Sequence, residues 1–295
     1  MVEYLVRLLS IDHKTAVLSR GYGRSSTGFK LATPNLTAEE LGDEPLQMYL
    51  KFHPAIQVAV GESRALAIPS ILLEEPGTEL VILDDAFQHR EVNPDLSILV
   101  TDYRTPFFRD HVLPAGRLRE FRSGARRADI IVVTKCPSGL EPDHREQYRN
   151  GIKKYNQQAP VYFTRIIYQD PIHCSNSKIP LPGSRILLLT GIAKPKTMVE
   201  YVSDRFTLVD HISYRDHFRY QKKHIDHLIK RFGTLGNKCD AILTTEKDMV
   251  RLKKFESLLD GLPIYYLPIE CQFIGDGQQF NQSVLNRLRN VKIDG

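Results

Sequence analysis

The chain has 295 residues, enough for one large or two modest domains. Its content of 42% hydrophobic and 25% charged residues excludes a globally disordered protein. The 40 Lys and Arg exceed the 35 Asp and Glu by 5, a charge too small and too dispersed to indicate a nucleic-acid-binding protein.

The sequence carries no membrane or secretion signal of the usual kind. No apolar run reaches the roughly 18–20 residues of a membrane span, and no charged-then-apolar signal peptide begins the chain. The four cysteines lie far apart without a CxxC pair, which indicates neither a zinc site nor a disulfide framework. We therefore expect a globular protein of the reducing cytosol.

Short β-branched runs alternate with longer amphipathic stretches, which is typical of an α/β fold with a mostly parallel sheet. Several runs are continuously apolar, as in strands covered on both faces. The predicted strands are 15–19, 56–60, 80–83, 96–100, 130–134, 161–167, 186–190, 206–210, 241–245 and 264–267. The predicted helices are 2–10, 38–51, 62–73, 143–156, 195–203, 217–232, 246–259 and 278–290.

One segment, 168–183, interrupts this rhythm with three prolines and several small polar residues. We predict that it links a first domain, 1–167, to a second, 184–295. A cleft between two such domains is the usual place for a ligand.

An acidic pair follows the predicted strand 80–83. Asp84 and Asp85 end the strand, and Gln88 and His89 come shortly after. Ligands gather at the carboxyl ends of parallel strands, and an apolar strand that ends in acid is a common way to hold Mg²⁺. A solvated turn is the alternative interpretation of the same pattern.

A glycine-rich turn, SRGYGR (19–24), follows the predicted strand 15–19. Its glycines permit close approach of the backbone, and its arginines suit an anion. The turn lacks the lysine and the length of a phosphate loop, and an ordinary surface turn is the alternative.

Other polar segments lie at or within predicted helices, where structural interpretations compete with functional ones. Asp43 in GDEP (42–45) precedes a proline that suits a first helical turn, where an acid commonly pairs with the helix dipole. Arg64 also begins a helix, and a solvated surface position is expected for it. The Asp216-His217 pair is either a base with its partner or a cap followed by an exposed histidine.

Several of these segments, taken together and in their order along the chain, indicate a family more specifically than any one segment does alone. SRGYGR, GDEP, LDDAFQHR, LPAGRLRE (113–120), a strand ending in Thr-Lys, RDH and TTEKD (244–248) resemble the tetraacyldisaccharide 4′-kinase family, over about residue 2 to beyond 270. The resemblance implies an enzyme that uses ATP to phosphorylate the 4′-hydroxyl of an acylated glucosamine disaccharide 1-phosphate in lipid A biosynthesis.

The resemblance also implies a fold and a location. We expect an α/β fold with a P-loop NTPase-like parallel-sheet core, its first strand and P-loop missing, and a second, smaller α/β domain. ATP and Mg²⁺ would bind in it, and the enzyme would be peripheral on the cytoplasmic face of the inner membrane.

Carried over by position, Asp43 matches the proposed general base of the family, and His217 matches the histidine that pairs with it. Asp84 and Asp85 match the acidic pair that serves Mg²⁺. Residues of the substrate- and nucleotide-binding region are matched by Tyr22, Arg24, Arg64, Gln88, Arg117 and Arg119.

The phosphate loop of the family, of the form GGTGKTP, would come immediately before the predicted helix 2–10. No segment of the given sequence matches the phosphate-loop pattern G-x-x-x-x-G-K-[ST]. We expect the natural start to lie upstream of Met1. The alternative is a truncated remnant that binds the lipid disaccharide without transferring phosphate.

Overall fold

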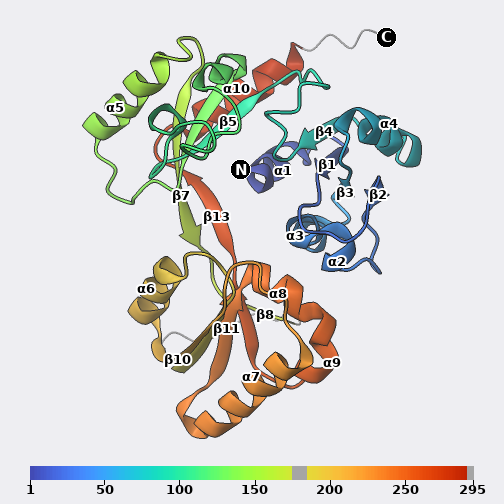
Figure 1. Cartoon of the computed structure of the whole chain (residues 1–295), viewed down its shortest axis with the longest axis vertical. Helices are drawn as coiled ribbons and strands as arrows, with labels where there is room; N and C mark the ends of the chain where they lie inside the picture. Colours follow the sequence, from blue (N-terminus) through green and yellow to red (C-terminus); the bar gives the residue numbers. More distant parts are fainter. Residues whose placement is uncertain (175–184, 291–295) are drawn as a thin grey trace. The chain divides into compact units, whose positions relative to one another are not determined.

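The computed structural model describes residues 1–174 and 185–290, which pack into two compact units (Figure 1). The first unit combines 1–20, 54–167 and the residues from 270 on, and the second combines 21–53 with 168–269. By packing, 21–53 thus group with the later part of the chain. The domain boundaries at 167 and 184 stay a prediction, and 175–183 of the predicted linker lie outside the described residues.

Parallel strands around the buried β1 form one sheet of the first unit. Strand β1 pairs on one side with β3 and on the other with β4. All five residues of β1 are buried, which explains why this strand reads as a continuous apolar run. The elements here are α1 (Val2–Leu9), β1 (Thr15–Ser19), β3 (Ile56–Val60), α4 (Arg64–Glu74) and β4 (Leu80–Leu83).

A second sheet of the first unit has the strand order β13-β7-β6-β5. Strand β5 begins at Ile98 rather than at the predicted residue 96, and directly before it Ser97 N donates to the Asp129 carboxylate at 2.8 Å in place of a strand partner. The elements here are β5 (Ile98–Asp102), β6 (Ile130–Thr134), α5 (Pro142–Lys153), β7 (Val161–Tyr168), β13 (Ile269–Phe273) and α10 (Gly277–Arg289).

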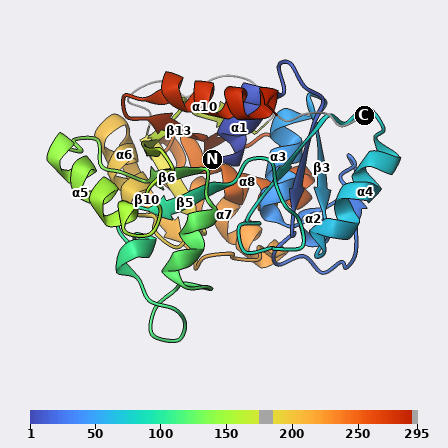
Figure 2. The ribbon, with the colours of Figure 1, turned by 90° about the horizontal axis from the view of Figure 1, so that it is seen from above.

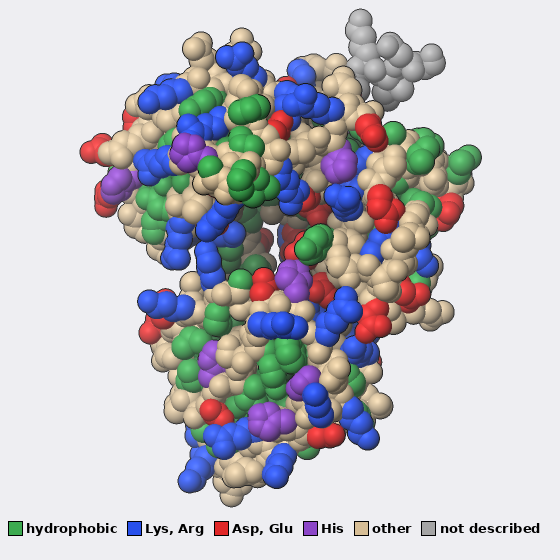
Figure 3. Space-filling view, in the orientation of Figure 1, with side chains coloured by type: hydrophobic (Ala, Val, Ile, Leu, Met, Phe, Trp, Pro, Cys, Tyr) green, Lys and Arg blue, Asp and Glu red, His purple; other side chains and the backbone are tan. Residues whose placement is uncertain are grey.

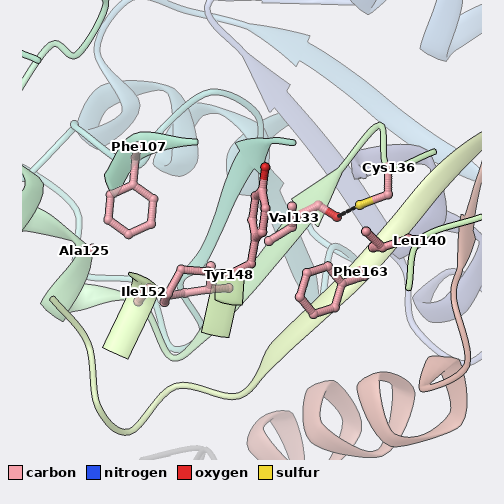
Figure 4. Close-up of a cluster of buried hydrophobic side chains, with 10 residues drawn as sticks. Phe107, Ala125, Val133, Cys136, Leu140, Tyr148, Ile152 and Phe163 are labelled. Atoms are coloured by element: carbon pink, nitrogen blue, oxygen red, sulfur yellow. Dashed lines mark hydrogen bonds between the residues drawn. The ribbon is translucent and has the colours of Figure 1, made fainter. Parts of the chain in front are cut away.

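Aromatic and aliphatic side chains fill the space between this second sheet and α5 (Figure 4). Phe163 of β7 and Ile152 of α5 are almost completely buried there. Cys136 donates a weak hydrogen bond to the Val133 carbonyl at 3.5 Å, and burial raises the pKa of this thiol to about 12. This cluster is the core that holds α5 on the sheet.

A separate aromatic group joins α1 to α10, which lie side by side in Figure 2. The ring of Tyr4 meets Phe273 at 4.9 Å and Phe280 at 5.7 Å between centroids. The Tyr4 hydroxyl donates to Asn281 Oδ1 at 2.9 Å. Edge-to-face packing of this kind adds stabilisation beyond burial alone, so both ends of the chain contribute to one core.

The second unit contains a sheet with the order β10-β9-β11-β12-β8. Neighbours from β10 to β12 run parallel, while β8 is antiparallel to β12. The sheet strands are β8 (Ile172–His173), β9 (Arg185–Thr190), β10 (Thr207–Ser213), β11 (Ala241–Thr245) and β12 (Ile264–Leu267). Strand β8 lies within the predicted linker.

Helices cover both faces of this sheet (Figure 1). Ile186 and Leu188 of β9 pack with the helix α6, whereas Leu187 and Leu189 pack with α7 on the other face. This alternation follows from the two-residue period of a strand. The helices of this unit are α2 (Ala38–Leu41), α3 (Asp43–Phe52), α6 (Lys196–Arg205), α7 (Lys222–Leu235), α8 (Glu246–Leu252) and α9 (Glu256–Leu259), and a short strand β2 spans Lys30–Leu31.

Three predicted helices differ from the observed ones. The stretch 38–51 is divided into α2 and α3 at Gly42, and 246–259 is divided by a 3₁₀ turn at Lys253–Phe255. The stretch 217–232 becomes helical only at Lys222, since the backbone at His217 is left-handed, with φ of 52°, and Gln221 is an extended N-cap. Within the ranges that the structure describes, no helix combines the length and the apolar character needed to cross a bilayer.

Replacing Phe163 with Ala should lower the free energy of unfolding by about 3–5 kcal/mol, because it leaves a cavity in a packed cluster. Urea unfolding followed by circular dichroism measures this loss. Phe121→Ala is the control, since Phe121 is 78% exposed and its removal should change little. Equal losses in both variants would contradict the burial of Phe163.

Candidate active site

Asp43 begins helix α3, and the preceding glycine permits this start. Gly42 has φ of 96°, and a Cβ there would lie 3.2 Å from the Tyr22 carbonyl oxygen. The carbonyl of Gly42 accepts the first-turn hydrogen bond from Leu46 N at 3.2 Å. Residue 42 therefore ends α2 and starts α3 in a conformation that favours glycine.

The carboxylate of Asp43 meets a cation and a histidine. Arg251 donates to its Oδ2 from Nε at 2.8 Å, and Nη2 lies 2.7 Å from the same oxygen. His217 Nδ1 lies 3.6 Å from that oxygen. The Asp43 side chain is 22% exposed and that of His217 48%, so the pair remains open to a ligand.

Arg251 of α8 is in turn held by buried groups. Its Nη1 donates to the Gly191 carbonyl at 3.0 Å and to Asp248 Oδ1 at 3.1 Å. Burial lowers its pKa, but the hydrogen bond to Asp43 and the charges of Asp43 and Asp248 outweigh burial and raise it. Arg251 is therefore a permanent cation between two carboxylates.

Asp248 has no exposed side-chain surface and is fully engaged. Its Oδ2 accepts from Gly191 N at 2.8 Å and from Thr245 Oγ1 at 2.7 Å, while the Thr245 side chain caps α8. The Tyr220 hydroxyl donates to Oδ1 at 3.3 Å, and burial together with Asp248 raises the pKa of Tyr220. This network fixes the position of Arg251.

Residues 21–24 of the glycine-rich turn also belong to the second unit. The Tyr22 ring is 83% exposed and lies edge-on to the His217 ring, with 6.2 Å between centroids. Arg24 instead binds within its own loop, with Nη2 donating to the Gly28 carbonyl at 2.6 Å. Tyr22 thus lies beside the Asp43–His217 pair, whereas Arg24 shapes the loop.

A shallow basic pocket opens on the same unit. In Figure 3, basic and histidine side chains mingle on the surface around α7. The pocket is lined by Arg215, His217, Phe218, Arg219, Gln221 and His224. A hollow of this composition suits an anionic ligand.

The acidic pair lies in the first unit. Asp84 N donates to the Leu18 carbonyl at 2.9 Å, which extends the parallel ladder to the end of β4. Asp85 then turns with φ of 46°, and its Oδ2 lies 3.1 Å from Arg119 Nη1. Both side chains of that ion pair are nearly two-thirds exposed, so its net contribution to stability is small.

Two carboxylates fit a magnesium ion. Mg²⁺ prefers oxygen ligands and is commonly bound by one or two carboxylates together with water and substrate phosphates. Within residues 1–174 and 185–290, no group of three or more His, Cys, Asp or Glu is arranged to hold a metal. A magnesium ion held by Asp84 and Asp85 would therefore need further oxygen ligands, from water or from substrate phosphates.

The expectation that Arg64 is solvated is wrong. Its side chain is completely buried, and it donates to the carbonyls of Gly61 at 2.5 Å and Asp84 at 3.1 Å. Burial lowers the pKa of its guanidinium, and its Nε has no hydrogen-bond partner in the described part of the chain. Because α4 starts soon after β3, its first residue lies over the strand ends and braces the backbone at Asp84.

Gln88 and Arg119 line a second shallow pocket in the first unit, with Phe87 and Phe121. Arg117 is exposed, and its backbone N donates to Asp110 Oδ1 at 3.3 Å. The predicted site residues therefore form two groups. The second unit holds Tyr22, Arg24, Asp43 and His217, and the first holds Arg64, Asp84, Asp85, Gln88, Arg117 and Arg119.

Sequence reasoning missed Arg251, Asp248 and Tyr220. Arg251 lies 208 residues from Asp43, so no local spacing connects them. One signal was present, since Asp248 and Arg251 are three residues apart on one helix face directly after a capping threonine.

Comparison with known proteins identifies the family. The family model described as tetraacyldisaccharide-1-P 4′-kinase matches residues 1–289. A tetraacyldisaccharide 4′-kinase of Bacteroides thetaiotaomicron is 41% identical over 97% of this chain and 80% of its own length. That of Flavobacterium psychrophilum is 39% identical over 100% of this chain and 84% of its own. This chain belongs to the tetraacyldisaccharide 4′-kinase family.

A solved structure supports the fold. The crystal structure of LpxK from Aquifex aeolicus in complex with ATP has a TM-score of 0.73 to this chain at 23% identity, covering 97% of this chain and 82% of that one. The predicted α/β class with a P-loop NTPase-like parallel-sheet core is thereby confirmed.

Replacing Gly42 with Ala should lower the free energy of unfolding by about 1–2 kcal/mol, because a Cβ is strained at this φ. Gly233→Ala is the matched control. Gly233 lies within α7 with no atom close to an added Cβ, so alanine there should stabilise by about 0.5–1 kcal/mol. Chemical unfolding of both variants checks the opposite signs, and a stable Gly42→Ala protein would contradict the assigned role.

Proposed function

We propose that this chain is an ATP-dependent kinase that phosphorylates the 4′-hydroxyl of tetraacyldisaccharide 1-phosphate in lipid A biosynthesis. Family membership supports the substrate and the reaction class. The observation that carries the proposal is the partly exposed Asp43 carboxylate, with His217 at 3.6 Å and Arg251 behind it. This arrangement can accept a proton from a bound hydroxyl.

In the proposed reaction Asp43 is the proton acceptor. The sugar O–H bond breaks as the oxygen forms its bond to the γ-phosphorus of ATP, ADP leaves with its bonding electron pair, and the proton passes to Asp43. His217 orients the carboxylate and shares the proton. Phosphoryl transfer depends mostly on positioning and charge stabilisation, so an acceptor held at a fixed place suffices.

The acidic pair of the first unit is proposed to hold Mg²⁺. When bound, this ion would neutralise charge on the phosphates of ATP. Arg64 keeps the backbone at Asp84 in place through its hydrogen bond to the carbonyl. We assign Gln88, Arg117 and Arg119 to the nucleotide and phosphate groups, and Tyr22 and Arg24 to the acceptor side.

We further propose that the enzyme works as a peripheral protein on the cytoplasmic face of the inner membrane. The acyl chains of the acceptor support this location, because such a lipid partitions into a bilayer.

Replacing Asp43 with Asn should lower turnover by about 10²–10⁴-fold, and His217→Asn by about 10–10²-fold, because each removes part of the proton acceptor. ATP affinity should stay within about threefold of wild type, since neither change touches the acidic pair. The assay is transfer of ³²P from ATP to the tetraacyl disaccharide 1-phosphate. Arg231→Gln, which removes a partner of Asp210 elsewhere in the second unit, is the control.

Wild-type rates in both variants would exclude the Asp43–His217 assignment. Binding of the disaccharide by the wild-type chain without phosphate transfer would favour the binding remnant instead of the kinase.

Replacing Asp84 or Asp85 with Asn should raise the Mg²⁺ concentration for half-maximal rate by about tenfold or more, because each change removes a charged oxygen ligand. Titration of the rate with Mg²⁺ at saturating ATP measures the shift. Asp95→Asn, an exposed acid of the same unit, should leave the titration unchanged. An identical Mg²⁺ dependence in all variants would place the metal elsewhere.

A further inference from the structure

We propose that Arg251 is a positioning residue, which holds Asp43 so that one carboxylate oxygen faces the acceptor hydroxyl. The inference rests on the proposed kinase function and assigns a task to a residue that the family motifs did not single out. Its basis is the geometry of one buried guanidinium between two carboxylates.

The contacts are unequal on the two oxygens of Asp43. Nε and Nη2 of Arg251 both approach Oδ2, at 2.8 and 2.7 Å, and His217 Nδ1 approaches the same atom at 3.6 Å. Oδ1 has no polar partner among the residues that the structure describes. A carboxylate held through one oxygen presents the other in a fixed direction, as a proton acceptor requires.

The guanidinium itself has little freedom. The Arg251 side chain is 6% exposed, and its Nη1 is held by the Gly191 carbonyl and Asp248. Asp248 is in turn fixed by the Gly191 amide and the Thr245 hydroxyl. All three guanidinium nitrogens are thus engaged, and the planar fork transmits its orientation to Asp43.

Arg251 is also close to His217. Its Nη2 lies 3.4 Å from Nδ1 of the imidazole, whose Nε2 lies 3.8 Å from Asp216. The guanidinium thus lies against the imidazole as well as against the carboxylate of Asp43. One residue therefore orders both members of the proposed dyad.

A purely structural role is the competing explanation, because ion pairs join α3 to α8 at other places. Lys51 of α3 pairs with Glu246 of α8 at 2.9 Å, and Lys247 of α8 pairs with Glu44 of α3 at 2.9 Å. The Lys51–Glu246 pair is also largely buried, with side chains 16% and 10% exposed. Lys51→Gln thus removes a similar brace between the same helices without touching Asp43.

The test compares Arg251→Gln, Arg251→Lys and Lys51→Gln in the full chain, with kcat and KM measured for ATP and for the disaccharide. Arg251→Gln should lower kcat by about 10–10²-fold with both KM values within about threefold, because misplacing a reacting group affects mainly the chemical step. Arg251→Lys keeps the charge and should recover part of kcat. Lys51→Gln should keep the wild-type kcat, and thermal unfolding should show how far each variant is destabilised.

A double-mutant cycle with Asp43→Asn separates positioning from folding. If Arg251 acts through Asp43, then Asp43→Asn/Arg251→Gln should be no slower than Asp43→Asn alone. The positioning role would be overturned if the losses in kcat of Asp43→Asn and Arg251→Gln multiplied in the double variant. Equal losses in kcat in Arg251→Gln and Lys51→Gln would also overturn it. So would a wild-type rate in Arg251→Gln.

The two proposals fail in different ways. A folded wild-type protein that carries the phosphate loop and still transfers no phosphate would overturn the kinase function and, with it, the task of Arg251. An active wild-type chain whose Arg251 variants keep the same kcat would overturn the task of Arg251 alone. If Arg251→Gln does not fold, Arg251→Lys and the cycle built on it decide the question.

Discussion

The ion pair between Asp43 and Arg251 is the constraint on which the rest of the proposed acceptor site depends. Burying a guanidinium costs free energy unless carboxylates pair with its charge. Arg251 pairs with Asp43 on one side and with Asp248 on the other. The buried Asp248 carboxylate is itself held by the Thr245 hydroxyl and the Gly191 amide, which both donate to Oδ2. The start of α3, the cap of α8 and the turn after β9 are therefore one connected unit.

The second constraint is backbone conformation at the ends of elements. Gly42, Asp85 and His217 all have positive φ, at 96°, 46° and 52°. This conformation is unfavourable for residues with a side chain and is kept only where surrounding contacts enforce it. At His217, for example, the backbone amide donates to the Asp216 carboxylate at 3.0 Å. Such turns place polar side chains directly beside strand and helix ends, where a ligand can reach them.

Much of the fold was predictable because buried parallel strands read as continuous apolar runs. The strands at 15–19, 56–60, 80–83, 130–134, 241–245 and 264–267 were predicted at the positions where they occur. Strands β2 and β8 have two residues each, too few to show a period, and β13 mixes apolar with polar residues. The sequence carried a signal for the break at Gly42, because Pro45 suits the first turn of a helix, but the prediction extended a single helix across it.

The sequence by itself determined the family, through the order of its motifs, and it determined that acids and arginines follow the ends of strands. Only the tertiary structure decided which of those side chains are buried and what they touch. The sequence pattern of an arginine at a helix start is the same whether the side chain faces water or lies over a strand end. The structure shows that Arg64 is completely buried. Arg251 contacts Asp43, which lies 208 residues away in the sequence, because helix α3 packs on helix α8. Spacing along the chain could not show this contact.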